Sequence, residues 1–437
     1  MLDIKFIREN AEAVKEVAKN KNIDLNIDQL LKLDKERLLQ LQDIEELLAE
    51  KNKLNELIPS AQGDEKIAVL EQGKNVKEKL ASAQPEFEKI KEQFEAMMIR
   101  VPNLISADTP IGKNEDENVV VRTVGEPTKF DFKPKDHMDL GEALGIIDMK
   151  TAVTVAGARF TYLLGEAAML QFALIQFVIN TLSDEKIVSQ LAEKVGNKFG
   201  KPFTFVVPPV MVKSEIMKKM DRFDPVDDRY YFEADNLLLV GSAEHSLGPI
   251  QMNKIAEEKD LPIRYVGYST AFRREAGTYG KDTKGILRVH QFDKLEMESF
   301  SRPENGLEEQ NLFVAIQEYI LQQLGIPYQV IAVCSGDMGK PDYRQIDINS
   351  WIPSQDKYRE THTSDYMTDF QARRLNAKYK KADGNTEFLH MNDATAIAIG
   401  RLLIAIIENF QQADGSVVIP EVLRKYMPGG ISVISRK

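Results

Sequence analysis

Two long helical patterns of apolar positions occupy much of the first hundred residues. Between residues 28 and 58 apolar positions recur at alternating three- and four-residue spacing, which predicts one helix of a coiled coil. The stretch from Pro59 to Asp64 predicts a stop and a turn. A second seam then runs from Val69 to Val101. Together these patterns predict an antiparallel helical hairpin over residues 28–101. Three positions of the first seam are polar, namely Arg37, Gln40 and Lys51.

Each helix of this hairpin would be roughly 45–55 Å long at about 1.5 Å per residue. Pro85 should kink the second helix and Pro102 should end it. The remaining positions are charged or polar, so the partner helix uses the single apolar stripe and the hairpin should extend into solvent. Periodicity alone fits a dimerisation coiled coil equally well.

Beyond the hairpin the pattern changes to strand-like runs mixed with helical ones. Residues 102–136 contain four prolines and one strand-like run, and they are interpreted as a linker and lead-in. Strands do not alternate regularly with helices, which disfavours a doubly wound parallel sheet and favours a mostly antiparallel sheet flanked by helices. The chain is therefore predicted to be an α+β protein with two domains, residues 1–104 and 105–437. The strand-like runs after the linker span residues 203–212, 231–241, 264–270, 289–300, 328–336 and 344–351.

Composition narrows the classes further. The 437 residues are too many for one ordinary core, and 43% apolar with 29% charged residues is typical of a globular protein. No apolar stretch is judged to approach a membrane span, and the charged N-terminus disfavours a secretion signal. Cys334 stands alone, which excludes an intramolecular disulfide and fits a reducing compartment, so we expect a cytoplasmic protein. The net charge of −11 argues against a general nucleic-acid coat but allows a local basic strip.

The segment from Phe272 to Glu298 is the most informative for chemistry. It is predicted to form a strand, a glycine-rich loop with Lys281 and Lys284 at a basic tip, and a second strand. An arginine, carboxylates and an aromatic ring on one sheet face can hold a phosphate, an amine and a flat base. A surface hairpin with solvated charges would show the same bare pattern. Strand alternation places two sets of side chains on single faces, namely Arg273 with Glu275, and Phe292 with Lys294 and Glu296.

The same segment closely resembles the second signature motif of class II aminoacyl-tRNA synthetases, in the form characteristic of seryl-tRNA synthetases. The match runs through FR-EAG--G-DT-G--R-HQF-K-E. Residues 334–339 and 358–374 resemble further blocks of that family, and residues 396–411 resemble the third class II motif. The resemblance covers essentially the whole chain. It implies a homodimer that activates serine with ATP to seryl-adenylate and transfers the seryl group to the 3′ end of serine tRNA, releasing AMP and pyrophosphate.

The resemblance assigns an ATP site. Arg273 corresponds to the arginine that holds the α-phosphate and the carboxylate side of serine, where its charge would stabilise the pentacoordinate phosphorus. Arg401 corresponds to the arginine on the γ-phosphate. Adenine would lie between Phe292 and Arg401, and Glu275 matches the carboxylate that accepts a hydrogen bond from the adenine amino group.

Glu360 and Thr363 match a carboxylate and a hydroxyl metal ligand of the family. Hard oxygen donors suit Mg²⁺, which bridges ATP phosphates, so Glu360 also belongs to the ATP site. An isolated Glu-x-x-Thr is ordinarily structural, and the assignment rests on the resemblance. The five histidines have no zinc-ligand spacing and are interpreted as structural.

The resemblance also assigns a serine pocket. Glu296 matches the carboxylate that takes the ammonium and hydroxyl groups, and Ser242, Glu244 and Thr395 would form the wall beside it, with Arg273 near the substrate carboxylate. Such a site rejects an analogue that lacks the hydroxyl by roughly 10⁴-fold, so alanine is refused by chemistry and threonine by shape. The sequence departs from the family pattern at Ser242 (usually threonine), His245 and Ser246 (Val-Pro), Asn349 (glutamate) and residues 393–396 (Asn-Gly-Ser-Gly).

Two other functions share this core, namely loading an amino acid onto a carrier protein and non-catalytic regulation. The intact hairpin disfavours the first, and the presence of Arg273, Arg401 and Glu296 disfavours the second. By resemblance the hairpin contacts the long variable arm of serine tRNA. Lysines on its second helix could meet phosphates, although interleaved acidic residues fit a solvated face equally well. These lysines are Lys66, Lys74, Lys77, Lys79, Lys89 and Lys91.

Overall fold

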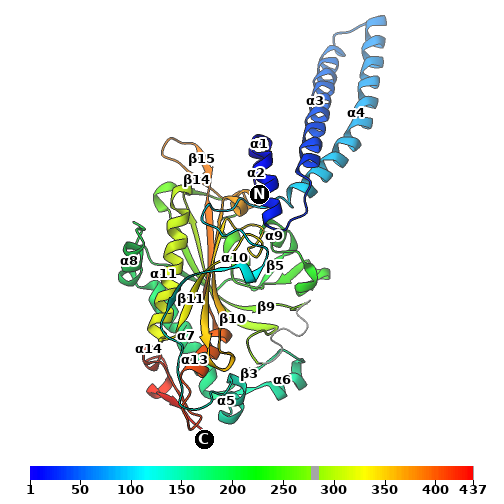
Figure 1. Cartoon of the computed structure of the whole chain (residues 1–437). Coiled ribbons are helices and arrows are strands. Elements are labelled where there is room, and N and C mark those ends of the chain that lie inside the picture. Colours follow the sequence, from blue (N-terminus) through cyan, green and yellow to red (C-terminus); the bar gives the residue numbers. More distant parts are fainter. Residues whose placement is uncertain (277–284, 437) are drawn as a thin grey trace. The chain divides into compact units, whose positions relative to one another are not determined.

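The computed structural model describes residues 1–276 and 285–436 and divides the chain into two compact units (Figure 1). The first unit is Met1–Leu104 and the second is Ile105–Lys437. Each unit has its own apolar core. The loop tip predicted at Lys281 and Lys284 lies outside the described residues.

The first unit is helical and contains the hairpin predicted from periodicity. Figure 1 shows its two long helices, α3 and α4, running side by side and joined by a short turn. The Asn26 side chain begins α3 by accepting a hydrogen bond from the N–H of Gln29, which satisfies one of the free donors at a helix start. The helices are α1 (Ile4–Glu9), α2 (Ala11–Asn20), α3 (Ile27–Leu57) and α4 (Gly63–Met98).

The seam between α3 and α4 is mainly apolar, as expected. One polar position, Arg37, is accommodated because its guanidinium lies 4.6 Å from the centre of the Phe94 ring and 2.9 Å from the buried Asp34 carboxylate. Arg8 of α1 also forms an ion pair with Asp34. The buried seam residues are Ile44, Leu54, Val69, Val76 and Leu80.

The end of α4 differs from the expectation. The helix runs through Pro85 as one element and ends at Met98, before Pro102 is reached. It ends there because Val101 is fully buried in a second cluster that includes Ile7 and Met98, which requires the chain to leave the helix axis. The 31 and 36 residues of α3 and α4 correspond to about 46 and 54 Å.

The second unit is built on an eight-stranded sheet with the order β1-β11-β12-β13-β16-β10-β9-β4. Every neighbouring pair is antiparallel except β4 with β9, so the predicted mostly antiparallel sheet is confirmed. Because β1 pairs with β11, the run interpreted as linker belongs to the sheet. The strands are β1 (Val119–Val124), β4 (Thr204–Val206), β9 (Ile263–Phe272), β10 (Gln291–Ser301), β11 (Tyr328–Ala332), β12 (Arg344–Ile352), β13 (Lys357–Thr368) and β16 (His390–Ala398).

Three helices pack on this sheet. α11 (Gly306–Leu324) contacts β13 and β16, α13 (Ile399–Asn409) contacts β10 and β12, and α7 (Gly165–Ser183) packs against α13. Their apolar side chains share one core with Leu295 of β10 and Ile346 of β12. Alternate residues of the same strands face the other way and include polar side chains such as Lys294 and Glu296 of β10.

Smaller elements surround this core. The helices are α5 (His137–Leu144), α6 (Met149–Ala156), α8 (Glu185–Lys194), α9 (Ser214–Lys219), α10 (Glu244–Leu247), α12 (Phe370–Leu375) and α14 (Glu421–Arg424). The short strands are β2 (Ile147–Asp148), β3 (Tyr162–Leu163), β5 (Met211–Lys213), β6 (Tyr231–Phe232), β7 (Leu237–Leu239), β8 (Ile255–Glu257), β14 (Lys378–Lys380), β15 (Thr386–Phe388), β17 (Val417–Val418) and β18 (Val433–Ile434).

Helix α7 corrects one expectation from the sequence. By length and composition it is apolar enough to cross a membrane, although no such stretch was expected. Half of its most apolar window is buried inside the unit. Leu170, Leu174 and Val178 are fully buried in the main core, so α7 is explained as a core helix of this fold, a class that passes the same test.

Candidate active site

The polar face of the sheet borders a cavity of about 400 Å³. Its lining comes from strands β10, β13 and β16, from the start of α13, from α10 and from the residues that follow β9. Nine of the ten residues predicted for catalysis or binding line this one cavity. They are Glu244, Arg273, Glu275, Phe292, Glu296, Glu360, Thr363, Thr395 and Arg401.

The register of the sheet explains how side chains distant in sequence meet. Glu296 lies opposite Thr395, and Thr363 lies opposite Asp347. Residues directly opposite each other on neighbouring strands present their side chains on the same face. The four strands β10, β16, β13 and β12 therefore present a continuous band of oxygen-bearing side chains to the cavity.

A β-bulge on β13 brings Glu360 onto the same face as Thr363. Residues three apart on a regular strand face opposite sides. Here Asn349 pairs with Glu360 but Ile348 pairs with His362, so one additional residue is inserted in β13. Both Glu360 and Thr363 consequently line the cavity.

The proposed metal ligands have close polar partners. Glu360 Oε1 accepts a hydrogen bond from Arg401 Nη1 at 2.6 Å, and Thr363 Oγ1 donates to Asp347 Oδ1 at 2.7 Å. Burial and the nearby Glu360 charge raise the pKa of Asp347 to about 7. Asp347 had no motif signal in the sequence, yet it adds a third hard oxygen donor to this group.

Arg273 lies directly beyond the end of β9 at Phe272. Its backbone N–H donates to the carbonyl of His290 at 3.0 Å, and its Nε donates to the carbonyl of Gly241 at 3.2 Å. The guanidinium carbon lies 5.5 Å from the centre of the Phe292 ring. A cation thus lies close to an aromatic face at one end of the cavity.

The expectation that Glu275 shares a strand face with Arg273 is wrong. Glu275 lies in a loop and has a φ of +52° in the left-handed region. The chain turns because Asp228 accepts two hydrogen bonds, one at its carbonyl from the N–H of Arg274 and one at its carboxylate from the N–H of Ala276. The Glu275 carboxylate instead pairs with Arg288 at 2.8 Å and still lines the cavity.

Ser242 lies behind the other end of the cavity and is fully buried. Its Oγ donates to Glu296 Oε2 at 3.0 Å and accepts from Lys294 Nζ at 3.3 Å. Lys294 Nζ also lies 2.5 Å from Glu296 Oε2. The cavity lining includes Phe292, Lys294 and Glu296, so these residues share one face of β10, as the alternation predicted.

Two further side chains fix Glu244. Arg222 Nε donates to Glu244 Oε1 at 2.8 Å, and this charge keeps the pKa of Glu244 well below its usual range although burial acts in the opposite direction. Burial lowers the pKa of His245 to about 4, so the ring is neutral. Since the N–H of Gly241 donates to His245 Nδ1, the proton is on Nε2, which lies 3.2 Å from Glu244 Oε1. His245 was interpreted only as structural and instead belongs to the cavity wall.

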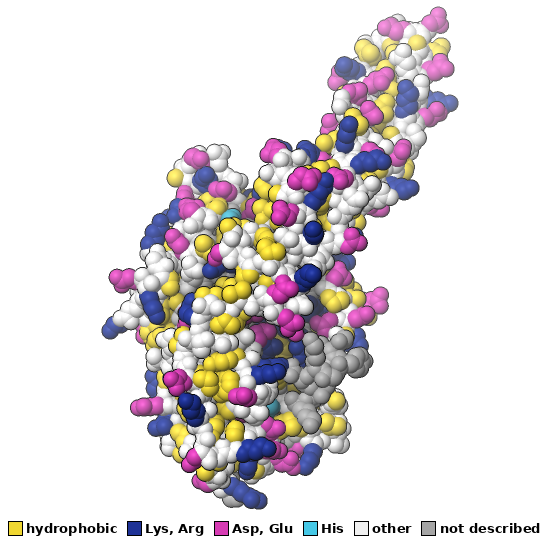
Figure 2. Space-filling view, viewed as in Figure 1, with side chains coloured by type: hydrophobic (Ala, Val, Ile, Leu, Met, Phe, Trp, Pro, Cys, Tyr) yellow, Lys and Arg dark blue, Asp and Glu magenta, His cyan; other side chains and the backbone are white. Residues whose placement is uncertain are grey.

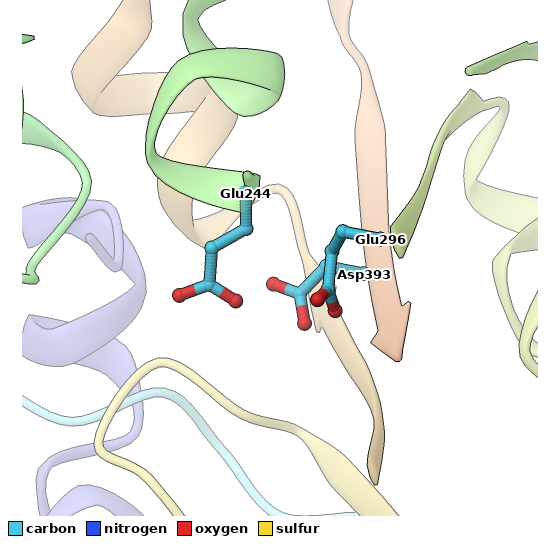
Figure 3. Close-up of side chains that lie close together, drawn as sticks. All are labelled: Glu244, Glu296 and Asp393. Carbon is cyan, nitrogen blue, oxygen red and sulfur yellow. The ribbon is translucent and has the colours of Figure 1, made fainter. Parts of the chain in front are cut away.

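Three carboxylates converge at this end, from Glu244, Glu296 and Asp393 (Figure 3). One oxygen of each lies within 4.8 Å of the others. Burial, together with neighbouring carboxylates, raises the pKa of Asp393 well above its usual range. In the sequence Asp393 was visible only as a departure from the family pattern, and Arg222 had no signal at all.

Comparisons with known proteins agree on one family. Residues 1–105 match the seryl-tRNA synthetase N-terminal domain, and residues 230–410 match the class II tRNA synthetase core domain (G, H, P, S and T). The chain is 38% identical to the serine–tRNA ligase of Thermodesulfovibrio yellowstonii, over 99% of this chain and 100% of that protein. It is also 38% identical to that of Corynebacterium glutamicum, over 98% and 97%.

Solved structures give the same picture. A seryl-tRNA synthetase from Pyrococcus horikoshii complexed with ATP is similar, with a TM-score of 0.89, 37% identity and complete coverage of both chains. A cytoplasmic serine–tRNA ligase from Naegleria fowleri in complex with AMP has a TM-score of 0.84 and 29% identity, covering 100% of this chain and 99% of that one.

Proposed function

Because this chain belongs to the seryl-tRNA synthetase family and is a serine–tRNA ligase, we propose that its cavity in the second unit is the site of serine activation. The enzyme activates serine with ATP to seryl-adenylate and transfers the seryl group to the 3′ end of serine tRNA, releasing AMP and pyrophosphate. The proposal that the reaction occurs in this cavity rests on one observation, namely that nine of the ten residues to which the family resemblance assigned roles line it together.

ATP would bind at the end of the cavity that holds Arg273, Phe292 and Arg401. The ring of Phe292 offers a flat surface for adenine, and the two guanidinium groups offer charge for the phosphates. Arg273 would neutralise the α-phosphate as the serine carboxylate attacks it, so catalysis consists of positioning and charge stabilisation. Glu275, whose carboxylate pairs with Arg288, is the proposed acceptor of a hydrogen bond from the adenine amino group.

Glu360, Thr363 and Asp347 fit a Mg²⁺ ion by the chemistry of their donors. All three offer hard oxygen atoms: Glu360 and Thr363 line the cavity, and Asp347 Oδ1 lies 2.7 Å from Thr363 Oγ1. When bound, the ion would supply neutralisation of phosphate charge. Arg401 would hold Glu360 in place through the 2.6 Å hydrogen bond.

Serine would bind at the opposite end. Glu296 would accept hydrogen bonds from the substrate, with Ser242 and Lys294 holding its carboxylate in position. Thr395 lies opposite Glu296 on β16 and adds a hydroxyl to the same wall. A pocket with these buried polar groups would leave them unpaired when alanine is bound, which is the physical basis of its rejection.

The hairpin of the first unit is the proposed contact for the long variable arm of serine tRNA. On the face shown in Figure 2, its surface carries basic and acidic side chains interspersed with one another, so binding would depend on individual lysine–phosphate pairs and on salt. Removing residues 28–101 should leave serine-dependent pyrophosphate exchange intact and abolish tRNA charging, and loss of both activities would contradict this assignment.

We also propose a cytoplasmic homodimer. Exposed apolar side chains on α7 and around β4 and β5 provide a surface that a second copy would cover. They include Met169, Phe172, Phe205, Val207 and Met211. Size-exclusion chromatography with light scattering should give about twice the 49.5 kDa chain mass, and a monomer would refute the dimer.

The decisive experiment is exchange of pyrophosphate into ATP with serine, alanine, threonine or glycine. Exchange with serine alone supports the proposed cavity chemistry. Absence of exchange with every amino acid, in folded protein, would refute it. The variant Arg273→Lys then tests whether the reaction occurs in this cavity. It keeps the positive charge but loses the planar, two-pronged guanidinium, so it should strongly reduce exchange.

A further inference from the structure

The three carboxylates at the serine end of the cavity differ in how they are compensated. Glu296 has Lys294 at 2.5 Å, and Glu244 has Arg222 at 2.8 Å. Asp393 has no such cation in hydrogen-bond distance, because Arg222 Nη2 is 3.8 Å from its Oδ2. Among the described residues, Asp393 Oδ2 has no hydrogen-bond partner, although Asp393 is only 1% exposed.

Neighbouring carboxylates add further negative charge that nearby cations do not balance. Glu298 lies directly opposite Asp393 on β10, is fully buried, and has no partner at either carboxylate oxygen within the described part of the chain. Asp365 lies opposite Asp393 on β13 and is also buried. A buried carboxylate without a donor is strongly destabilising unless it gains a proton or a cation. The end of the cavity is therefore short of positive charge.

We propose that Asp393, with Glu244 and Glu296, binds the α-ammonium group of the amino acid substrate. This assignment rests on the proposed serine site and adds a residue to it. An ammonium group donates three hydrogen bonds in tetrahedral directions, and at about 2.8 Å from each acceptor these acceptors are about 4.6 Å apart. The three carboxylate oxygens lie within 4.8 Å of one another and point toward a common space (Figure 3).

A divalent cation is the less suitable occupant. A Mg²⁺ ion binds oxygen at about 2.1 Å, which places adjacent ligands only about 3 Å apart. Lys294 and Arg222 already contribute two positive charges beside the cluster, and they would repel a doubly charged ion more than a singly charged ammonium.

Asp393→Asn tests the role of the charge with little change in side-chain volume. In pyrophosphate exchange it should raise the KM for serine roughly 10- to 100-fold, the usual effect of losing a charged hydrogen bond, and leave the KM for ATP unchanged. Glu298→Gln is the matched control, since it removes a buried carboxylate from the neighbouring position without removing one of the three acceptors. It should affect the serine KM far less.

Competitive inhibitors identify the substrate group that Asp393 contacts. Alanine has the ammonium but no hydroxyl, and 3-hydroxypropionate has the hydroxyl but no ammonium. Asp393→Asn should weaken the binding of alanine by the same factor as the binding of serine. It should not weaken the binding of 3-hydroxypropionate. Equal weakening of both inhibitors, an unchanged serine KM, or an equal effect of Glu298→Gln would overturn the proposal.

A calorimetric titration separates the ammonium from a metal ion. Serine should bind the wild-type enzyme without ATP equally well in the presence and absence of EDTA. Binding that is lost with EDTA and restored by Mg²⁺ or Zn²⁺ would assign the cluster to a metal and overturn the proposal. Wild-type enzyme without serine-dependent exchange would instead refute the proposed function, so the two failures are distinguishable.

Discussion

The buried ion pair between Arg264 of β9 and Glu309 of α11 gives the sharpest test of how the second unit is stabilised. Both side chains are fully buried. Arg264 donates to the two oxygens of Glu309 at 2.7 and 2.6 Å, and to the carbonyls of Lys201 and Phe199 at 2.6 and 2.9 Å. One guanidinium thus joins the sheet, a helix and the loop before β4.

Arg264→Met removes all four of these hydrogen bonds. Among the described residues, Glu309 then retains only the hydrogen bond from Asn197 Nδ2, at 2.7 Å, and becomes an uncompensated buried charge. Such a loss costs about 3–5 kcal/mol of the free energy of unfolding. The double variant Arg264→Met with Glu309→Leu removes the charge as well, so it should recover most of that loss.

Urea unfolding followed by tryptophan fluorescence would measure these changes. Trp351 is the only tryptophan and it is buried in the second unit, so the signal reports that unit. Lys150→Met is the control, because its pair with Glu142 is solvent-exposed on both sides, so its removal should leave the unfolding midpoint nearly unchanged. A cost below about 1 kcal/mol for Arg264→Met, or a double variant no more stable than the single one, would refute the reasoning.

Three further predictions follow from the cavity. Ser242→Ala should raise the serine KM roughly 10-fold or more without changing the ATP KM, since a buried charged acceptor loses its hydrogen bond; steady-state exchange kinetics would check this. Arg401→Met should lower kcat/KM for ATP by about 10²-fold, and unchanged kinetics would argue against a phosphate contact. Burial lowers the pKa of His245 to about 4 and of His362 to about 3, so the stability they contribute is complete above about pH 6.5 and lost as the pH falls toward those values. Buried carboxylates with raised pKa, such as Asp347 and Asp393, act in the opposite direction, so the test is a comparison: between pH 7 and pH 5, His362→Asn should lose less stability, or gain more, than the wild type.

Local sequence patterns predicted the hairpin and the cavity-lining face of β10, because residue spacing along one segment determines both. The hairpin followed from three- and four-residue spacing because α3 and α4 bury only one stripe, and a polar residue such as Arg37 is tolerated where it can stack on an aromatic ring. The face of β10 that carries Phe292, Lys294 and Glu296 followed from alternation because its pairing with β9 is regular throughout.

The rest of the site depends on contacts that alternation cannot encode. The turn at Glu275 is imposed by Asp228, which is far away in sequence. The inserted residue of β13 reverses the direction of Glu360, and only the family resemblance predicts a ligand role for Glu360. Arg222 acts through Glu244, and no pattern around it indicated this.

The direction of β10 agrees with the orientation proposed for serine in the cavity. From Phe292 to Glu296 the strand covers about 13 Å, at about 3.3 Å per residue. Arg273 stands over Phe292 at one end, and Glu296 faces Glu244 and Asp393 at the other. An amino acid carries opposite charges on adjacent groups, so this field would direct its ammonium toward the carboxylates and its carboxylate, the proposed nucleophile, toward the arginine and the α-phosphate. Asp393 would strengthen the acidic end of that field, which links the departure in the family pattern to the orientation that the reaction requires.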